Sequence, residues 1–156
     1  MAGAGSVAGL VDALGRHERI GLDTPVFIYH LEGSSRYAEP AGHVFDELAG
    51  GSFAGVTSVL TLMELAVKPL QLGRPEVADE YEVLLANFPH LTVAGIDRPA
   101  ARRAAELRAM HRLRPADALQ VASCLEAGAT AFVTNDRDFR RVSDFQVLLL
   151  DDFLVR

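Results

Sequence analysis

Cysteine and lysine are almost absent from this sequence of 156 residues, and long apolar runs are absent altogether. The single cysteine, Cys124, excludes an internal disulfide bond and a metal cluster held by several thiolates. No apolar stretch is long enough to span a bilayer, and the first residues lack a basic leader. We therefore expect a protein of the cytoplasm that makes no membrane contact. Lys68 is the only lysine, so nearly all basic charge comes from arginine.

The composition is that of an ordinary globular protein, with 49% apolar residues and a formal net charge of −6. This length predicts one domain with a proper core. The negative charge argues against general electrostatic capture of nucleic acid. Local capture stays open, because the arginines are clustered and form either solvated helix faces or a rim that contacts phosphate. The clustered residues are Arg98, Arg102, Arg103, Arg108, Arg112 and Arg114, followed by Arg137, Arg140 and Arg141.

Short apolar runs alternate with segments of helical periodicity along most of the chain. Strands that alternate with helices predict a parallel α/β sheet with right-handed crossovers. We assign residues 1–18 to an N-terminal extension with a short helix, residues 19–152 to the domain and residues 153–156 to a tail. The predicted strands are 19–22, 53–57, 91–94, 131–133 and 145–149, and the predicted helices are 7–14, 25–31, 39–49, 59–68, 75–87, 98–112 and 115–127.

Four acidic residues occupy related places in this pattern. Asp23 directly follows a predicted strand, Asp136 comes three residues after the end of another, and Glu64 and Asp117 lie near the starts of helices. In a parallel sheet all four places lie at the edge formed by the carboxyl ends of the strands, where open α/β proteins bind ligands. The sequence therefore predicts that the four carboxylates converge.

Three of the four acids also have a simpler local explanation. A carboxylate stabilises the start of a helix, which accounts for Asp117 without any further function. Glu64 and Lys68 are spaced as a favourable i,i+4 pair, and Asp136 lies among ordinary turn residues. Asp23 is the exception, because we expect Thr24 to cap the helix predicted at 25–31.

Converging carboxylates repel one another unless something positive holds them. Hard divalent cations such as Mg²⁺ or Mn²⁺ prefer oxygen ligands, and such a site orients a phosphodiester and activates water. Neither a serine nor a cysteine nucleophile is then needed, and the sequence contains no nucleophile-elbow motif. The acids thus favour metal-dependent phosphoryl chemistry.

Four segments carry a family resemblance in addition. They read IGLDTPVFIY at 20–29, TSVLTLMEL at 57–65, PADALQVA at 115–122 and TNDRDF at 134–139. In this order the set resembles the PIN-domain family, in particular the VapC-like toxins of type II toxin–antitoxin systems, over residues 19–152. The resemblance implies a three-layer α/β/α sandwich around a five-stranded parallel sheet. It also implies metal-dependent endonucleolytic cleavage of RNA, a homodimer and a cognate antitoxin protein.

By the same resemblance, Asp23, Glu64, Asp117 and Asp136 are the catalytic acids that bind Mg²⁺ or Mn²⁺. The resemblance does not decide between Asp136 and Asp138 as the direct ligand. Residues expected to assist the acids or contact the substrate are Thr24, Thr134, Asn135, Arg137 and Asp138.

Two other classes of protein remain as alternatives. One is a PIN-like module without catalytic activity that acts by binding protein or RNA. The other is a phosphatase or phosphoryl receiver on a similar sheet, but Pro25 stands where an aspartyl phosphatase needs its second acid. The helices predicted at 25–31 and 39–49 also carry more apolar side chains than we expect one core to cover, which predicts a subunit interface. The residues concerned include Phe27, Ile28, Leu31, Val44 and Phe45.

Overall fold

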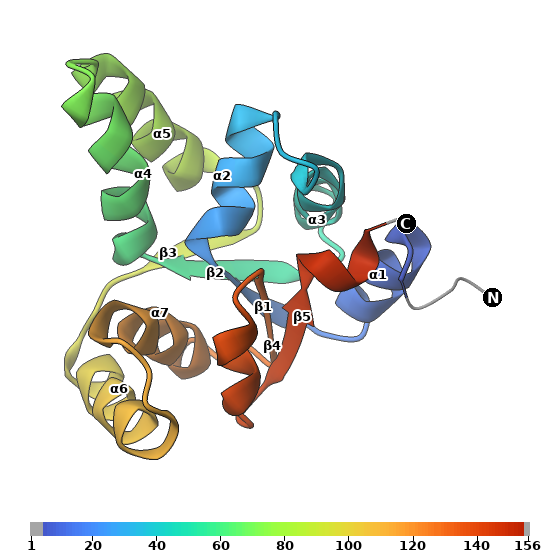
Figure 1. Cartoon of the computed structure of the whole chain (residues 1–156), viewed down its shortest axis with the longest axis vertical. Helices are drawn as coiled ribbons and strands as arrows, with labels where there is room; N and C mark the ends of the chain where they lie inside the picture. Colours follow the sequence, from blue (N-terminus) through green and yellow to red (C-terminus); the bar gives the residue numbers. More distant parts are fainter. Residues whose placement is uncertain (1–4, 155–156) are drawn as a thin grey trace.

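The computed structural model describes residues 5–154, and its centre is a sheet of five parallel strands (Figure 1). Neighbouring strands follow the order β3-β2-β1-β4-β5, and every pair is parallel. The parallel sheet predicted from the sequence is confirmed, and no strand end differs from its predicted place by more than one residue. The strands are β1 (Arg19–Leu22), β2 (Ala54–Ser58), β3 (Leu91–Ala94), β4 (Ala131–Thr134) and β5 (Gln146–Leu149).

The order of the strands reverses at the middle of the sheet. The chain passes from β1 outward through β2 to β3, and then returns to the other side of β1 to form β4 and β5. Leu22 of β1 pairs with Val133 of β4, so the residues after these two strands emerge side by side. A reversal of this kind opens a crevice at the carboxyl ends of the strands. Asp23 follows β1 at this crevice, and Asp136 follows β4.

Helices cover both faces of the sheet, which confirms the predicted three-layer sandwich. One apolar core contains buried residues of α1 to α5, and the other contains buried residues of α6, α7 and η1. Figure 1 shows α2 and α3 on one side of the sheet and α6 and α7 on the other. The elements are α1 (Val7–Leu14), α2 (Thr24–Glu32), α3 (Ala38–Ala49), α4 (Val59–Gln71), α5 (Pro75–Asn87), α6 (Arg98–His111) and α7 (Pro115–Glu126), with 3₁₀ turns η1 (Arg137–Arg141) and η2 (Leu150–Phe153).

Helix α7 packs very closely against the central strand. A Cβ atom at Gly21 of β1 would lie 2.7 Å from Phe132 and 2.9 Å from Cys124 of α7. Only glycine permits this approach without displacing a neighbour. Residues 120–124 of this helix are all buried.

One helix end differs from its prediction by more than one residue, and one helix is capped by another residue than predicted. The helix predicted to stop before Pro69 continues to Gln71, because Leu65 and Pro69 are both buried on its inner side and their packing offsets the hydrogen bond lost at proline. Helix α2 is capped by Asp23 rather than by Thr24. Asp23 accepts a hydrogen bond from the Thr24 backbone N–H at 3.0 Å, while the Thr24 hydroxyl is used elsewhere.

The prediction that α2 and α3 carry exposed apolar side chains is wrong in part. Phe27, Val44 and Phe45 are buried within the single chain, because α2 and α3 pack against each other and Phe27 contacts Phe45. Ile28 and Leu31 are only partly buried. The exposed apolar side chains instead gather on α4 and α5, among them Val59, Met63, Val67, Leu70, Val83 and Leu84.

The two ends of the described chain belong to the same domain. Leu10 and Leu14 of α1 are fully buried in the core that also contains Phe153 of η2. The helix predicted for the N-terminal extension therefore packs onto the sandwich, whereas residues 1–4 of that extension and residues 155–156 of the tail lie outside the described residues. Between residues 5 and 154, no helix has the length and apolar character to cross a membrane.

Candidate functional site

Asp23 is a buried carboxylate at the reversal point of the sheet. Its side chain is 8% exposed, and its second oxygen accepts a hydrogen bond of 2.7 Å from the Thr134 hydroxyl. The pKa of Asp23 is raised from 3.8 to about 7, mainly by burial and to a smaller extent by the charges of Asp117 and Glu64. Hydrogen bonds from Thr134 and Thr24 oppose this rise. The carboxyl group is therefore close to half protonated at neutral pH.

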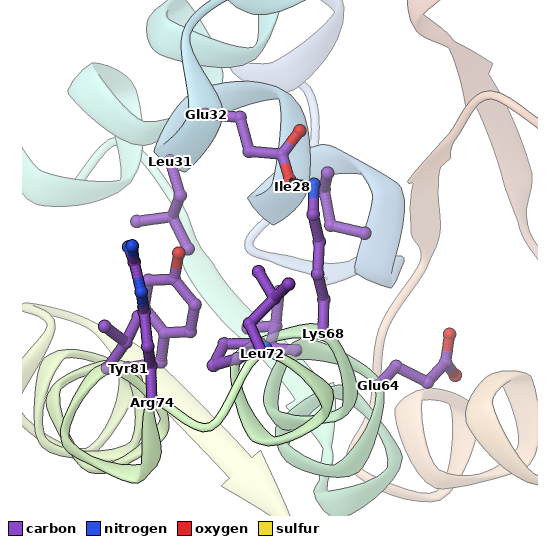
Figure 2. Close-up of a pocket in the computed structure, with 11 residues that line it drawn as sticks. Ile28, Leu31, Glu32, Glu64, Lys68, Leu72, Arg74 and Tyr81 are labelled. Carbon is purple, nitrogen blue, oxygen red and sulfur yellow. Dashed lines mark hydrogen bonds and ion pairs between the residues drawn. The ribbon is translucent and has the colours of Figure 1, made fainter.

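Glu64 does not form the ion pair expected from its spacing. Lys68 lies 3.3 Å from Glu32 of α2, and Figure 2 shows its side chain reaching toward that residue. Burial raises the pKa of Glu64, as does the charge of Asp117, while the Thr24 hydroxyl lowers it. The i,i+4 ion pair with Lys68 is therefore absent, and the charge that acts on Glu64 is that of Asp117.

Asp117 lies in the first turn of α7, where helix geometry alone would favour an acid. Its pKa is nevertheless raised, first by burial and then by the charge of Asp136. Arg114 opposes the rise, and Asp138 adds to it less strongly. Asp117 is therefore electrostatically linked to acids from three other parts of the chain.

Asp136 and Asp138 differ in their surroundings. Asp136 caps η1 by accepting a hydrogen bond from the Asp138 N–H at 2.9 Å, and it is partly buried. Asp138 is exposed, and one of its oxygens lies 3.3 Å from Arg141. Asp136 also acts more strongly on Asp117. These contacts favour Asp136 over Asp138 as the acid of the site.

The other predicted site residues divide between the site and the scaffold. Thr134 bridges two acids, because its hydroxyl donates to Asp23 and accepts from the Asp136 N–H at 3.1 Å. Asn135 accepts from the Asp151 N–H and donates to the Tyr29 hydroxyl, which ties η2 to α2. Arg137 is paired with Asp151 at 2.9 Å. Asn135 and Arg137 therefore brace the structure around the acids, and Thr24 contacts Thr61 at 3.0 Å.

The chemistry of these donors suits a hard divalent cation. None of the four acids forms an ion pair within the described part of the chain. Among residues 5–154, however, no three His, Cys, Asp or Glu side chains are placed to hold one metal ion together. Mg²⁺ is commonly bound through one or two carboxylates, with water completing its shell. The arrangement fits that mode better than a closed cage of protein ligands.

Several buried polar residues beside the acids were missed by sequence reasoning. Gln120 of α7 bonds Ser58 and Thr61, and Thr57 bonds Thr61 and the Leu22 carbonyl. The available signal was a glutamine in a helix that is otherwise apolar and buried. Such a side chain requires polar partners, and the sequence does not show where those partners lie.

Most of the clustered arginines are paired with acids. Ion pairs join Arg102 to Glu106, and Arg103 to Glu126 and Asp144. Arg140 and Arg141 are paired with Asp152 and Asp138. Arg98, Arg108, Arg112 and Arg114 form no ion pair among the described residues, and of these four only Arg114 is a named cause of the pKa shift of Asp117. Of the predicted phosphate rim, Arg114 is thus the residue that lies next to the acids.

A groove of about 240 Å³ lies between α2 and the hairpin of α4 and α5 (Figure 2). Glu64 belongs to its lining, and Figure 2 shows that this carboxylate points away from Tyr81 and Arg74. The groove therefore adjoins the acidic site. Its apolar lining consists of Ile28, Leu31, Leu65, Leu72, Val77 and Tyr81.

Comparison with known families and structures agrees with this geometry. The sequence profile of the PIN domain matches residues 20–144. Comparison with the sequences of curated proteins finds no match.

The fold is similar to that of chains in solved structures of VapBC complexes and of FitAcB. VapBC2 from Rickettsia felis, bound to a DNA fragment from its promoter, is 17% identical with a TM-score of 0.66, covering 83% of this chain and 97% of that one. DNA-bound VapBC from Salmonella typhimurium is 22% identical with a TM-score of 0.64, covering 85% and 98%. FitAcB from Neisseria gonorrhoeae is 20% identical with a TM-score of 0.61, covering 84% and 97%. At these identities the likeness establishes the fold alone.

Proposed function

Because this chain belongs to the PIN-domain family, we propose that it is an endoribonuclease that uses a divalent cation and acts as the toxin of a toxin–antitoxin pair. One observation carries the proposal. At the carboxyl edge of the sheet, Asp117 and Glu64 raise the pKa of Asp23, and Asp117 raises that of Glu64, while none of these three acids has an ion-pair partner among residues 5–154. The test is RNA cleavage by the purified protein with Mg²⁺ or Mn²⁺ and with EDTA.

One or two of the four acids Asp23, Glu64, Asp117 and Asp136 would bind the cation directly, and the others would act on it through its bound water. When bound, the cation offsets their repulsion, polarises the phosphodiester and lowers the pKa of a coordinated water. Asp23 must release its proton for this role, and the hydrogen bonds from Thr134 and Thr24 favour the ionised form. Thr134 also keeps Asp23 and Asp136 in a constant relation, since its hydroxyl contacts both residues.

We expect Arg114 to contact a phosphate of the RNA. Replacing it by glutamine should raise KM for RNA about two- to fivefold while kcat changes less, the size typical of one exposed charge. The measurement is steady-state cleavage at two salt concentrations, because a phosphate contact weakens as salt rises. Arg102→Gln is the matched control, since Arg102 is an exposed arginine already paired with Glu106. Equal effects of the two changes would argue against a specific contact by Arg114.

An antitoxin segment is the proposed occupant of the groove beside Glu64. The solved structures similar in fold are complexes of toxin with antitoxin, and an extended apolar groove suits the apolar face of a peptide or helix. Lys68, Glu32 and Arg74 at the groove offer charges that would orient such a segment. A partner bound here would lie next to the acids and would restrict access of RNA to them.

A homodimer is proposed through the exposed apolar side chains of α4 and α5. Met63 and Val83 are 54% and 62% exposed, and burying such residues at an interface is favourable. Met63→Glu should therefore shift the protein toward monomer in light scattering at micromolar concentration. Met110→Glu is the control, because Met110 is 73% exposed but lies on α6. A wild-type protein that is monomeric at high micromolar concentration would contradict this proposal.

A further inference from the structure

Gln120 links the two helical layers at the edge of the sheet that carries the acids. Its Nε2 donates to the Thr61 hydroxyl at 2.9 Å, and its Oε1 accepts from the Ser58 hydroxyl. Gln120, Thr61 and Ser58 are all nearly or completely buried. Both partners are hydroxyls, which can donate or accept, so the orientation of the amide depends on the hydrogen bonds that Thr61 makes beyond it.

Thr61 has two further polar contacts through its hydroxyl, one of them with the Thr24 hydroxyl at 3.0 Å. The Thr61 hydroxyl also lies 2.7 Å from that of Thr57, and Thr57 donates to the Leu22 carbonyl at the end of β1. Because the single proton of Thr57 is used on Leu22, Thr61 must donate to Thr57 and accept from Gln120. A continuous chain of hydrogen bonds thus runs from α7 through α4 and β2 to β1.

The hydrogen bond between Gln120 and Thr61 lies about one helical turn from two of the acids. Thr61 precedes Glu64 by three residues on α4, and Gln120 follows Asp117 by three residues on α7. Residues three apart on a helix lie on the same face. The Gln120–Thr61 bond therefore joins the two helical turns whose carboxylates repel each other.

We propose that Gln120 is a positioning residue, which together with Thr61 sets the separation of Glu64 and Asp117 before any cation binds. The inference rests on the proposed function for its effect on cation binding. Repulsion between Glu64 and Asp117 favours separation of the two helical turns that carry them. A rigid buried link holds the ligands within binding distance, as outer residues of metal sites generally do.

The test compares Gln120→Met and Thr61→Val with the wild type, because both changes keep the size of the side chain and remove the hydrogen bond. Each protein is titrated with MnCl₂ in a calorimeter, well below its unfolding temperature. The affinity for Mn²⁺ should be roughly tenfold to a hundredfold weaker in each variant than in the wild type. The kcat for RNA cleavage should fall in both variants, while KM for RNA changes less than about twofold. Thr61→Ser keeps the hydroxyl and should restore the Mn²⁺ affinity of the wild type.

Ser123→Ala is the matched control. Ser123 is buried on the same helix, but its hydroxyl donates only to Leu119 one turn away. A merely structural role for Gln120 predicts that Gln120→Met lowers the melting temperature as Ser123→Ala does and leaves Mn²⁺ affinity and kcat unchanged. That result would overturn the inference.

Hydrogen exchange of the metal-free protein separates this inference from the proposed function. Loss of the link should speed exchange of the backbone amides around Glu64 and Asp117 in Gln120→Met and not in Ser123→Ala. If the wild type binds no Mn²⁺, the proposed metal chemistry fails, while faster exchange would still support the link. Unchanged exchange at both turns would refute it whatever the metal does.

Discussion

Asp23→Asn and Asp117→Asn should each slow RNA cleavage by roughly a hundredfold or more under saturating Mg²⁺. Both changes keep the shape of the side chain and remove one negative charge from the site. Groups that position a proton or stabilise charge in a transition state commonly contribute this much to a rate. The loss should appear in kcat, because neither side chain is expected to contribute much to binding the RNA.

The measurement is single-turnover cleavage of a labelled RNA pool with Mg²⁺, Mn²⁺ or EDTA. Asp79→Asn is a suitable control, since Asp79 is an exposed acid on α5. Asp138→Asn should retain most of the activity, because Asp138 is exposed and paired with Arg141, whereas Asp136→Asn should not. Full activity in EDTA, or in both site variants, would exclude the proposed mechanism. A folded wild type that cleaves no RNA would instead favour the inactive module.

The metal-free protein should become less stable as the pH rises from about 4 to 8, and Asp23 should account for much of that loss. Its pKa is raised from 3.8 to about 7 in the folded state, so between these values the folded protein holds a proton that the unfolded chain has released. Stability falls with pH wherever the unfolded state binds fewer protons. The stability present below pH 4 is therefore lost as the pH rises toward 7, by at most roughly 4 kcal/mol.

Asp23→Asn should remove this dependence and raise stability at pH 8 by an amount on the order of 1 to 4 kcal/mol. Urea unfolding of both proteins in EDTA at pH 5 and pH 8 measures the effect. If Asp23 acts only as a helix cap, asparagine replaces it with almost no change at either pH, because the two residues cap helices equally well.

Mg²⁺ supplies the complementary measurement at pH 8. A ligand that binds only the folded state stabilises it by mass action, so wild type should gain stability from millimolar Mg²⁺ and Asp23→Asn should gain less. An equal gain in both proteins would remove Asp23 from the metal site. Asp117→Asn should behave in the same direction, since its pKa is also raised by burial and by neighbouring acids.

The sequence by itself determined the alternation of strands and helices and the edge at which the acids lie. Both depend on short-range information. The helix at 75–87 and the strand at 91–94 follow from periodicity and turn residues within each segment, and the structure has them at those bounds. Once the strands are parallel, residues that follow them must emerge at one edge, so Asp23 and Asp136 could be brought together without coordinates.

Only the tertiary structure decided how each side chain is used. Lys68 pairs with Glu32 of another helix instead of Glu64 on its own, and Phe27 and Phe45 cover each other rather than a second subunit. The raised pKa of Asp23 and the bond between Gln120 and Thr61 likewise depend on groups far apart in the chain. Burial and hydrogen bonding are properties of the packed assembly of helices and strands. A local pattern therefore predicts which residues gather at the edge of the sheet, while packing decides which of them pair, titrate or lie exposed.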